Sequence, residues 1–463
     1  MLDNKSDDIT YFFVSDNEKE VEIFVGIESY ATSKIKGING EYKSLFKDFI
    51  VKEIDKNGKI LSIIEDFSNP KFSKDLHDKF TTFNLIKVNR DTFEAIRKIS
   101  KALKIPSNLI QYSGLKDKQA ISVQKVSIKG NYINELQKLK IRDIFIRNIY
   151  PSKKPVKIGS HQGNHFTITI RNLTDSNNLK RNIEKILKYI KTFGFPNYFG
   201  LQRFGNYRPN SHIVGQLFLK GDYENAFKEY VSSTYSTESN ESRIARSEFK
   251  RDGDLKKAYD RFPKLLKYEK EMIYFLLNHP NNYEGATKTL PKDLIRLLIS
   301  SFQSYLFNRM ISTRVKKGIP LFKPVNGDVI SILDDKNGNI TQIKYIYGAG
   351  YDNYLKKAIK INRALIVLPI IGSTTNLDDF PLMKTIFEDI CREDKIDKEI
   401  FKSDYIDGND FKGAIRAMTV KPNGLHMIEF ATDELNPSKK KIKIEFSLQK
   451  GSYATMLLRE LIK

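Results

Sequence analysis

The 463-residue sequence contains a single cysteine, Cys391, and no apolar run long enough to span a membrane. One cysteine excludes an intramolecular disulfide and a cysteine-based metal cluster within the chain. The most apolar run, residues 364–371, is short and is interrupted by Pro369. The first residues, MLDNKSDDITYFF, lack the basic and apolar regions of a secretion signal. We therefore expect a cytoplasmic protein without a membrane segment.

Acidic residues are scarce relative to basic ones. Lys and Arg number 78 and Asp and Glu number 56, which leaves a formal charge of +22. A positive field of this size favours a polyanionic partner, and binding that releases counterions weakens steeply with salt. Nucleic acid is therefore the expected partner, although a lysine-rich composition can also reflect coding bias.

The length of the whole chain suggests two or three domains. Strand and helix patterns alternate through its first half. Segments 47–54 and 59–64 flank an Asn-Gly signal and predict a β-hairpin. Further strands are expected over residues 81–90, 120–130 and 141–150. Residues 91–106 predict a helix with a capping box at Asp91 and Glu94, and with Phe93, Ile96, Ile99 and Leu103 on its inner face. A second helix is expected from about residue 176 to a stop at Gly194.

The most informative stretch is YSGLKDKQAISVQ, residues 112–124. It places Asp117 between two lysines, in a short loop between two strand-like segments. An Asp in such a loop more often stabilises a turn than reacts, because its side chain bonds to nearby backbone groups. Taken alone, this position predicts only a turn.

Four separated segments give this loop a second interpretation. They resemble, in the same order, motifs of the TruD family of tRNA pseudouridine synthases: YKSLFKDFIVKE (42–53), GLKDKQAISVQ (114–124), NYFGLQRFG (197–205) and GSYATMLLREL (451–461). The resemblance covers roughly residues 43–463. The long region after residue 222 is more similar to the archaeal and eukaryotic branch than to the shorter bacterial one.

The resemblance implies an α+β pseudouridine synthase fold, with a mixed, largely antiparallel sheet flanked by helices and a large inserted α+β TRUD domain. The implied catalytic domain comprises residues 1–221 and 411–463, and the insertion comprises residues 222–410. The patterns agree with a long helix over 291–318, a strand pair over 328–346, a returning strand over 413–422, an alternating strand over 442–448 and a final helix from Ser452. Because the chain leaves the catalytic domain and returns, truncation near Met310 should unfold it.

In this family the Asp of the G-x-K-D motif attacks a uridine, which implies that Asp117 is the nucleophile. Lys43 would face this carboxylate and keep it ionised. The same motif assigns Gly114 and Lys116 to substrate binding. Asn164, in a G-N-x-F-T segment, would form a wall of the site.

The N-Y-F-G-x-Q-R-F-G motif supplies the remaining implied site residues. Asn197 would orient the Asp loop or the uracil, and Phe199 would stack on a flipped base. Gln202, Arg203 and Gly205 would support that loop, and Gln202 and Arg203 are counted among the substrate-binding residues. Aromatic rings interleaved with Gly, Asn and Arg also suit contact with bases and phosphates.

The implied reaction converts uridine 13 of tRNA to pseudouridine. The N-glycosidic bond breaks, the uracil turns, and its C5 joins the ribose. No group is oxidised or imported, so we expect no cofactor and no metal. A carboxylate nucleophile can form a covalent intermediate, by attack on either the ring or the ribose. The expected partner is tRNA, no protein partner is inferred, and we expect a monomer.

Two other classes of function make different demands on the sequence. A non-catalytic RNA-binding protein or RNA chaperone on the same fold would tolerate loss of Asp117. A metal-dependent nuclease or an AdoMet methyltransferase would need a carboxylate cluster or a glycine-rich nucleotide loop, and YGAGYDN (347–353) lacks both a third glycine and an expected following helix. His161 and His165 have the spacing of metal ligands on a helix, but the residues between and after them predict a turn and a strand.

Overall fold

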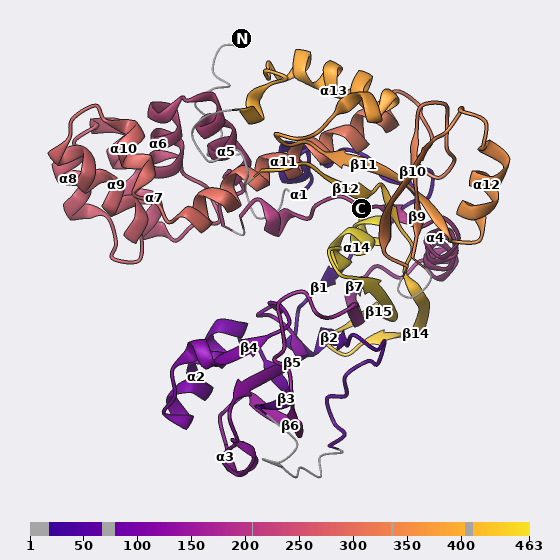
Figure 1. Cartoon of the computed structure of the whole chain (residues 1–463). Coiled ribbons are helices and arrows are strands. Elements are labelled where there is room, and N and C mark those ends of the chain that lie inside the picture. Colours follow the sequence, from indigo (N-terminus) through magenta and orange to yellow (C-terminus); the bar gives the residue numbers. More distant parts are fainter. Residues whose placement is uncertain (1–17, 67–78, 206, 335–337, 403–410) are drawn as a thin grey trace. The chain divides into compact units, whose positions relative to one another are not determined.

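The structure is a computed structural model that describes residues 18–66, 79–205, 207–334, 338–402 and 411–463 (Figure 1). Its contacts divide the chain into two units. The large-sheet unit spans residues 32–195 and 420–463, and the helix-rich unit comprises residues 196–419 together with the segment before residue 32. These divisions differ from the boundaries predicted at 222 and 411, and the functional domain division stays a prediction. Among the described residues, no helix combines the length and apolar character that crossing a membrane requires.

The large-sheet unit is built on a nine-stranded sheet whose main path runs β14-β15-β7-β2-β5-β3-β6. Strands β2 and β5 run parallel, and the other neighbours are antiparallel, as the mixed and largely antiparallel prediction required. Its strands are β1 (Glu41–Tyr42), β2 (Phe49–Ile54), β3 (Phe80–Val88), β4 (Ile110–Tyr112), β5 (Ile121–Lys129), β6 (Ile144–Ser152), β7 (Gly163–Leu173), β14 (Asn423–Asp433) and β15 (Asn436–Gln449). Its helices are α2 (Thr92–Leu103), α3 (Ile133–Lys138), α4 (Leu179–Phe193) and α14 (Ala454–Ile462).

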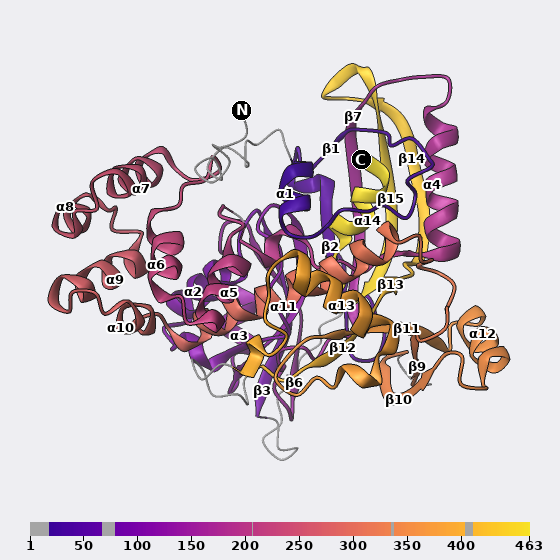
Figure 2. The ribbon, with the colours of Figure 1, turned by 90° about the horizontal axis from the view of Figure 1, so that it is seen from above.

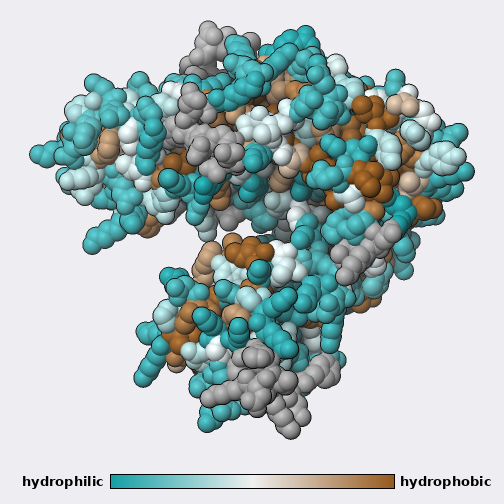
Figure 3. All heavy atoms as spheres, in the orientation of Figure 1, coloured by the Kyte–Doolittle hydropathy of each residue, from teal (hydrophilic) through white to brown (hydrophobic). Residues whose placement is uncertain are grey.

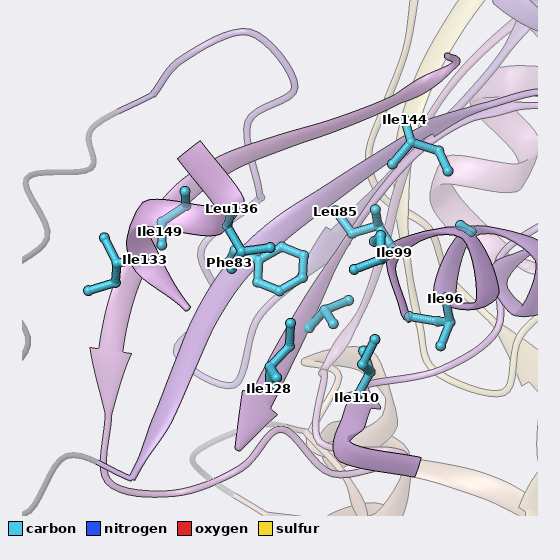
Figure 4. Packing of buried hydrophobic residues seen from close by; sticks show 12 residues of the cluster. Phe83, Leu85, Ile96, Ile99, Ile110, Ile128, Ile133, Leu136, Ile144 and Ile149 are labelled. Carbon is cyan, nitrogen blue, oxygen red and sulfur yellow. The ribbon is translucent and has the colours of Figure 1, made fainter. Parts of the chain in front are cut away.

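One hydrophobic core lies where α2 and α3 cover β3, β5 and β6 (Figure 4). Phe83 and Leu85 of β3 lie on either side of the polar Asn84 and pack with Ile96 and Ile99 of α2. Helix α2 begins where it was predicted, because the Asp91 side chain accepts a hydrogen bond from the Glu94 N–H. This core gives the loop between β4 and β5 a rigid base.

The other half of the sheet, β7 with β15 and β14, packs with α4 and α14 (Figure 2). The predicted alternation holds along β15, where Ile442, Ile444, Phe446 and Leu448 are all buried. Helix α4 buries the predicted apolar face and ends at Gly194, whose φ of +90° is a left-handed conformation that glycine adopts without strain. The final helix starts after Tyr453 rather than at Ser452.

The helix-rich unit is organised around one long helix, α11, which packs against α5, α13 and β11. Its four-stranded sheet has the order β10-β9-β11-β12. The helices are α1 (Glu18–Phe24), α5 (Ser211–Lys220), α6 (Tyr223–Ser232), α7 (Asn240–Asp252), α8 (Leu255–Arg261), α9 (Lys267–Asn278), α10 (Tyr283–Lys288), α11 (Lys292–Lys316), α12 (Asp352–Lys360) and α13 (Pro381–Glu393). The strands are β9 (Val329–Leu333), β10 (Ile340–Ile346), β11 (Ala364–Ile370) and β12 (Ala414–Ala417). A short two-stranded sheet is formed by β8 (Phe195–Pro196) and β13 (Thr419–Val420).

Three local expectations were wrong. Residues 59–64 form no second hairpin strand beyond one bridge at Ile60, because β5 and β7 already occupy the two edges of β2. Phe93 is 55% exposed and lies outside the inner face of α2. A helix, α12, does follow the glycines at 348 and 350, so only the missing third glycine still argues against a nucleotide loop there.

Candidate active site

Asp117 lies in the segment that joins β4 to β5 and has no regular secondary structure. Strand β4 pairs with the second half of β5, with Tyr112 opposite Val126, so the chain must cross back to enter β5 at Ile121. The crossing segment, residues 113–120, is here called the Asp117 loop. Asp117 itself is half-buried within it.

A buried lysine holds this loop from beneath. Lys87 of β3 has no exposed surface, and its ammonium donates hydrogen bonds to the carbonyls of Arg90 (2.7 Å), Lys116 (3.0 Å) and Asp117 (2.6 Å). Burial lowers the pKa of Lys87 to about 8, against the opposing effect of the Asp117 and Asp91 charges. One ammonium therefore binds two successive carbonyls of the loop, those of Lys116 and Asp117.

A buried carboxylate holds the same loop from β2. Glu53 is 1% exposed and pairs with the Lys116 ammonium at 3.0 Å. It also accepts hydrogen bonds from the Lys125 N–H at 3.2 Å and from the Ser113 hydroxyl. Lys116, which the sequence assigned to the substrate, is thus occupied inside the protein. Its side chain supports the loop instead of facing solvent.

Polar side chains from β5 and α2 complete the support. The Gln124 amide donates to the Gly114 carbonyl at 3.1 Å and accepts from the Thr92 hydroxyl at 3.2 Å. Thr92 in turn accepts from the Lys116 N–H at 3.1 Å. Gly114 lies close to His161, because a Cβ added there would stand 3.3 Å from the imidazole Cε1. A side chain at position 114 would therefore need this ring to shift.

The Asp117 carboxylate stands apart from all these bonds. Within the described part of the chain, no group donates a hydrogen bond to it and no cation forms an ion pair with it. The loop is held through its backbone and through Lys116, and the carboxylate is left available for a ligand. This is the arrangement that a nucleophile needs.

Lys43 lies at the same edge of the sheet as Asp117. Strands β2 and β5 are parallel neighbours, with Ile50 opposite Ile121, so the segments that precede them meet at one edge. The Lys43 ammonium lies 4.4 Å from the centroid of the Phe49 ring. No ion pair joins Lys43 to Asp117 among the described residues, and the expected pairing stays a prediction.

A buried ion pair fixes the segment that carries Lys43. Asp48 accepts two hydrogen bonds from Arg171, both at 2.8 Å, and one from the Leu45 N–H at 2.8 Å. Asp433 binds the same guanidinium at 2.7 Å. These carboxylates raise the pKa of Arg171 above its usual value. The turn between Lys43 and β2 is thereby tied to β7.

Asn164 and His161 carry polar atoms that the described structure leaves unpaired. Asn164 of β7 stands opposite Glu53, and its Oδ1 is buried without a partner in the described residues. The same holds for the Nδ1 of His161, whose pKa is lowered by burial and by the Lys116 charge. Buried polar atoms without partners are costly, so these two suit a bound ligand. The sequence suggested His161 only as a metal ligand, and the residues around it argued against that role.

The metal interpretation of the two histidines has no support in the described structure. His165 lies on β7, where its Nδ1 is 2.9 Å from the Ser447 hydroxyl and its Nε2 pairs with Glu445. No cluster of three acidic, histidine or cysteine side chains among the described residues could hold a metal ion.

A basic pocket borders the support of the Asp117 loop. Its volume is about 530 Å³, and Glu53 and His161 are among its lining residues. Lys56, Lys153 and Lys154 also line it and are exposed. Their charge suits a phosphate group of an RNA backbone.

The remaining predicted site residues lie in the helix-rich unit, near the start of residues 196–419. The Asn197 amide donates to the Ala417 carbonyl at 2.9 Å, and its Oδ1 accepts from Arg416 at 2.7 Å. Asn308 of α11 accepts from the Phe199 N–H at 2.8 Å and donates to the Phe199 carbonyl at 3.1 Å. The backbone around Phe199 is therefore fixed from both sides.

The Phe199 ring is half-buried, and its neighbours include Phe307 and the guanidinium groups of Arg203 and Arg416. Phe307 contacts it edge to face at 5.5 Å, and the Arg416 guanidinium lies 4.1 Å from its centroid. Arg416 thus touches both Asn197 and Phe199, the two residues expected to face a uracil. Sequence reasoning missed it, because GAIRAMTV was interpreted only as a returning strand.

The other residues of the motif differ in what they do. Arg203 donates to the hydroxyls of Ser304 (3.1 Å) and Ser300 (2.8 Å) on α11, and its expected role in the site stays a prediction. Gly205 has a φ of +115°, and a Cβ there would collide with the Arg208 carbonyl. Gln202 is exposed and makes no hydrogen bond among the described residues, and its expected role stays a prediction.

The structure therefore brings Lys43, Gly114, Lys116, Asp117 and Asn164 into one unit, and Asn197, Phe199, Gln202 and Arg203 into the other. The first group comes from segments far apart in the sequence, whereas the second lies within one short segment that is held by residues of α11 and by Arg416. Glu53, Lys87, His161 and Arg416 are the members that sequence reasoning did not assign.

Comparison with known proteins gives consistent matches over almost the whole chain. The family model described as tRNA pseudouridine synthase D (TruD) matches residues 24–461. A protein of Methanosarcina mazei named "Probable tRNA pseudouridine synthase D" is 31% identical over 451 residues, which cover 96% of this chain and 98% of that protein. A protein of the same name from Thermococcus sibiricus is 31% identical, with 93% and 96% covered. The crystal structure of a Methanosarcina mazei TruD protein superposes with a TM-score of 0.79 at 30% identity, covering 96% of this chain and 98% of that one.

Proposed function

The chain belongs to the tRNA pseudouridine synthase D (TruD) family, and from this premise we propose that Asp117 is the nucleophile with which it isomerises uridine 13 of tRNA. The family activity is tRNA pseudouridine(13) synthesis, an isomerase reaction. The assignment of individual residues to that reaction is our proposal.

The observation that carries the proposal is the contrast within the Asp117 loop. The loop backbone is held by the buried Lys87 ammonium and, through Lys116, by the buried Glu53 carboxylate. The Asp117 carboxylate takes part in none of these bonds. Because the loop backbone is fixed and the carboxylate makes no hydrogen bond of its own, little reorganisation is needed when the substrate binds.

The other residues receive roles that follow from their surroundings. Lys43, at the same sheet edge, would keep Asp117 ionised and offset negative charge on the RNA. Asn164 and His161 would offer hydrogen bonds to the substrate from their unpaired atoms. Gly114 lets the loop approach His161, and Lys116 acts as a support rather than as a substrate ligand.

Phe199 is proposed to stack on the uracil after it leaves the helix stack of the tRNA. Flipping a base costs a few kcal/mol, and contact with an aromatic face offsets part of that cost. The Arg416 guanidinium already lies over the Phe199 ring, so the uracil would contact the guanidinium as well as the ring. Asn197 is buried and its amide bonds Arg416 and the Ala417 carbonyl, so it would orient the uracil through Arg416 rather than by direct contact.

In the proposed reaction the bond between uracil N1 and ribose C1′ breaks and a bond between C5 and C1′ forms. The proton leaves C5, and N1 gains one, so the overall reaction neither consumes nor releases another group. Asp117 forms a covalent bond to the substrate and is released at the end.

The test is tritium release from tRNA labelled at uracil C5, with the intact protein, with Asp117→Asn and with Asp175→Asn as a matched control. Asp175 is an exposed aspartate of the same unit. We expect release by the intact protein and by the control, and a loss of about 10⁴-fold or more in Asp117→Asn, as for other nucleophile removals. RNA binding should be retained in all three.

Release by Asp117→Asn at the rate of the intact protein would remove Asp117 from the mechanism. Binding without release from any of the proteins, across tRNAs with uridine at position 13, would favour the RNA-binding alternative. We further propose that the chain acts as a cytoplasmic monomer without a protein partner, and sedimentation of the free protein tests the monomer.

A further inference from the structure

One surface of the helix-rich unit carries aromatic and basic side chains that the proposed reaction does not use. It is formed by β10, the turn that follows it and α12. Residues 340–363 contain five basic residues and a single acidic one, Asp352. In the same stretch Tyr345, Tyr351 and Tyr354 are 38%, 58% and 75% exposed. Figure 3 shows hydrophobic and intermediate residues together on the part of the surface that β10 and α12 occupy.

The three tyrosines share one side of this surface. Tyr345 stands opposite Ile330 of β9, and Ile330 packs in a small core with Leu355 of α12, so Tyr345 faces the side that α12 covers. The rings of Tyr345 and Tyr351 lie 5.6 Å apart at 53°. Tyr351 is the N-cap residue of α12, and Tyr354 follows it by three residues, so the two lie on the same face of the first helical turn.

Lysines lie beside these rings. Lys357 follows Tyr354 by three residues and shares its helix face, while Lys356 and Lys360 are four apart on the neighbouring face. All three are exposed. The Lys356 ammonium lies 5.6 Å from the Tyr347 ring, and a hydrogen bond to Tyr347 raises the pKa of Lys356. The tyrosine patch is defined as Tyr345, Tyr351, Tyr354, Lys356, Lys357 and Lys360.

The turn is shaped to present the patch. Gly348 and Gly350 have φ values of +100° and +106°, and a Cβ on Gly348 would collide with the Asn326 side chain. Asp352 accepts the Gly348 N–H at 2.7 Å, so the one local carboxylate is engaged in holding the turn. The exposed charge of the patch is therefore positive.

We propose that the tyrosine patch binds unpaired nucleotides of the tRNA, in addition to the target uridine. Bases would stack on Tyr351 and Tyr354, and the three lysines would contact backbone phosphates. Exposed flat rings beside flexible cations are what sequence-tolerant binding of single-stranded RNA requires, and the positive charge complements the phosphates. The inference rests on the proposed function for the identity of the RNA.

The test compares binding of unmodified tRNA and of a short unstructured oligouridine by matched variants of the full chain. Tyr351→Ala combined with Tyr354→Ala should weaken both affinities by about tenfold or more, because stacking is lost. The corresponding double change to Phe should bind like the intact protein, because the rings remain. Tyr274→Ala is the matched control, since Tyr274 is 56% exposed on α9, and it should leave binding unchanged.

The lysines give a second, independent readout. Replacing Lys356, Lys357 and Lys360 with Ala should reduce the steepness with which affinity falls as salt rises, by close to one unit for each phosphate that is no longer neutralised. The same change should leave the salt dependence untouched if these lysines only solubilise the surface, and that result would overturn their part in the patch.

The proposal is overturned if the double Ala variant binds both RNAs like the intact protein, or if Tyr274→Ala weakens binding equally. Sedimentation of a dimer that the double Ala variant abolishes would assign the patch to a second copy of this chain instead. These outcomes are separate from failure of the proposed function, which appears as no tritium release by the intact protein. An RNA site on the patch would still show in the binding assay.

Discussion

The Asp117 loop and the segment from Asn197 to Gly205 both lie outside the α-helices and strands and are held by distant parts of the chain, but different forces hold them. Buried charges support the first, with Lys87 and Glu53 beneath it. The second is held by hydrogen bonds to neutral oxygen acceptors, among them those that the Phe199 N–H and the Arg203 guanidinium donate to α11 and the one that the Arg416 guanidinium donates to Asn197. The first arrangement leaves a carboxylate unused, and the second leaves part of an aromatic ring exposed.

The difference matches what each segment must present. A nucleophile needs a fixed backbone and an available carboxylate, and the Lys87 ammonium fixes the backbone through carbonyls without a hydrogen bond to the Asp117 carboxylate. A stacking ring needs a fixed plane, which edge contacts and backbone hydrogen bonds provide. We therefore expect the first segment to respond mainly to changes of charge, and the second mainly to changes of shape.

The largest effect should come from breaking the charge support of the Asp117 loop. Glu53→Gln leaves the Lys116 ammonium buried without its carboxylate, with only 4% of that side chain exposed. Loss of one partner of a buried pair costs about 3–5 kcal/mol in the free energy of unfolding. Denaturant unfolding of the intact protein and the variant measures it.

Two controls sharpen this prediction. Asp175→Asn removes a partner of an exposed pair with Lys440 and should change stability by no more than about 1 kcal/mol. Lys116→Met added to Glu53→Gln should restore part of the loss, because no unpaired charge remains. Equal stability of Glu53→Gln and the intact protein would show that charge does not hold the loop.

A smaller effect is expected from Arg416, which acts by shape as well as charge. Arg416→Ala removes the plane over Phe199 and a hydrogen bond to Asn197, and it should lower kcat/KM by about 10-fold to 100-fold, or roughly 1.4–2.8 kcal/mol. Arg416→Lys keeps the charge but loses the planar fork, so it should rescue little. Steady-state kinetics on tRNA separates the two variants.

The split between kcat and KM decides what Arg416 does. A residue that positions the uracil for reaction should lower kcat, whereas one that only stabilises the unit should lower the amount of folded protein and leave the kinetics of the remainder unchanged. Full activity in Arg416→Lys would mean that charge alone matters in this segment, and the contrast between the two regions would disappear.

Much of the fold could be predicted from local patterns. Helices α2 and α4 and strand β15 followed from the spacing of apolar residues and from capping signals. The prediction of a strand over residues 59–64 was wrong. A local pattern cannot show that β5 and β7 are already the neighbours of β2 in the sheet. Phe93 was placed inward by spacing, although the inner face of α2 is set by the sheet it covers.

Site residues that belong to a sequence motif could be predicted. Those that reach the site only through the tertiary fold could not. Asp117 and Phe199 came from motif resemblance. Lys87 and Glu53 were missed because each looks like an ordinary strand residue, and only the fold shows that they meet the Asp117 loop. A signal existed: both are charged residues within strands rich in apolar side chains, FNLIKV and FIVKEI. A charge in such a place must find a partner.

The smallest effect concerns the titration of Lys87, and it distinguishes support of the loop from support of the fold. Burial lowers the pKa of Lys87 from 10.5 in the unfolded chain to about 8 in the folded one. Between these values the unfolded chain binds more protons, so the contribution of Lys87 makes the free energy of unfolding rise with pH. A neutral amine has only two N–H groups for its three carbonyls, so the Asp117 loop should loosen over the same range. We therefore expect activity to fall a few-fold as pH rises through about 8.

The measurement is a pH series of tritium release and of unfolding, each compared between the intact protein and Lys87→Met. Other lysines and tyrosines titrate in the same range, but they are present in both proteins, and the difference isolates Lys87. If, in that difference, activity falls with pH while the free energy of unfolding rises, then the charged form of Lys87 supports the loop but lowers the stability of the fold. Parallel trends would instead place Lys87 with the general packing of β3, and Glu53 alone would then remain as the charged support of the nucleophile.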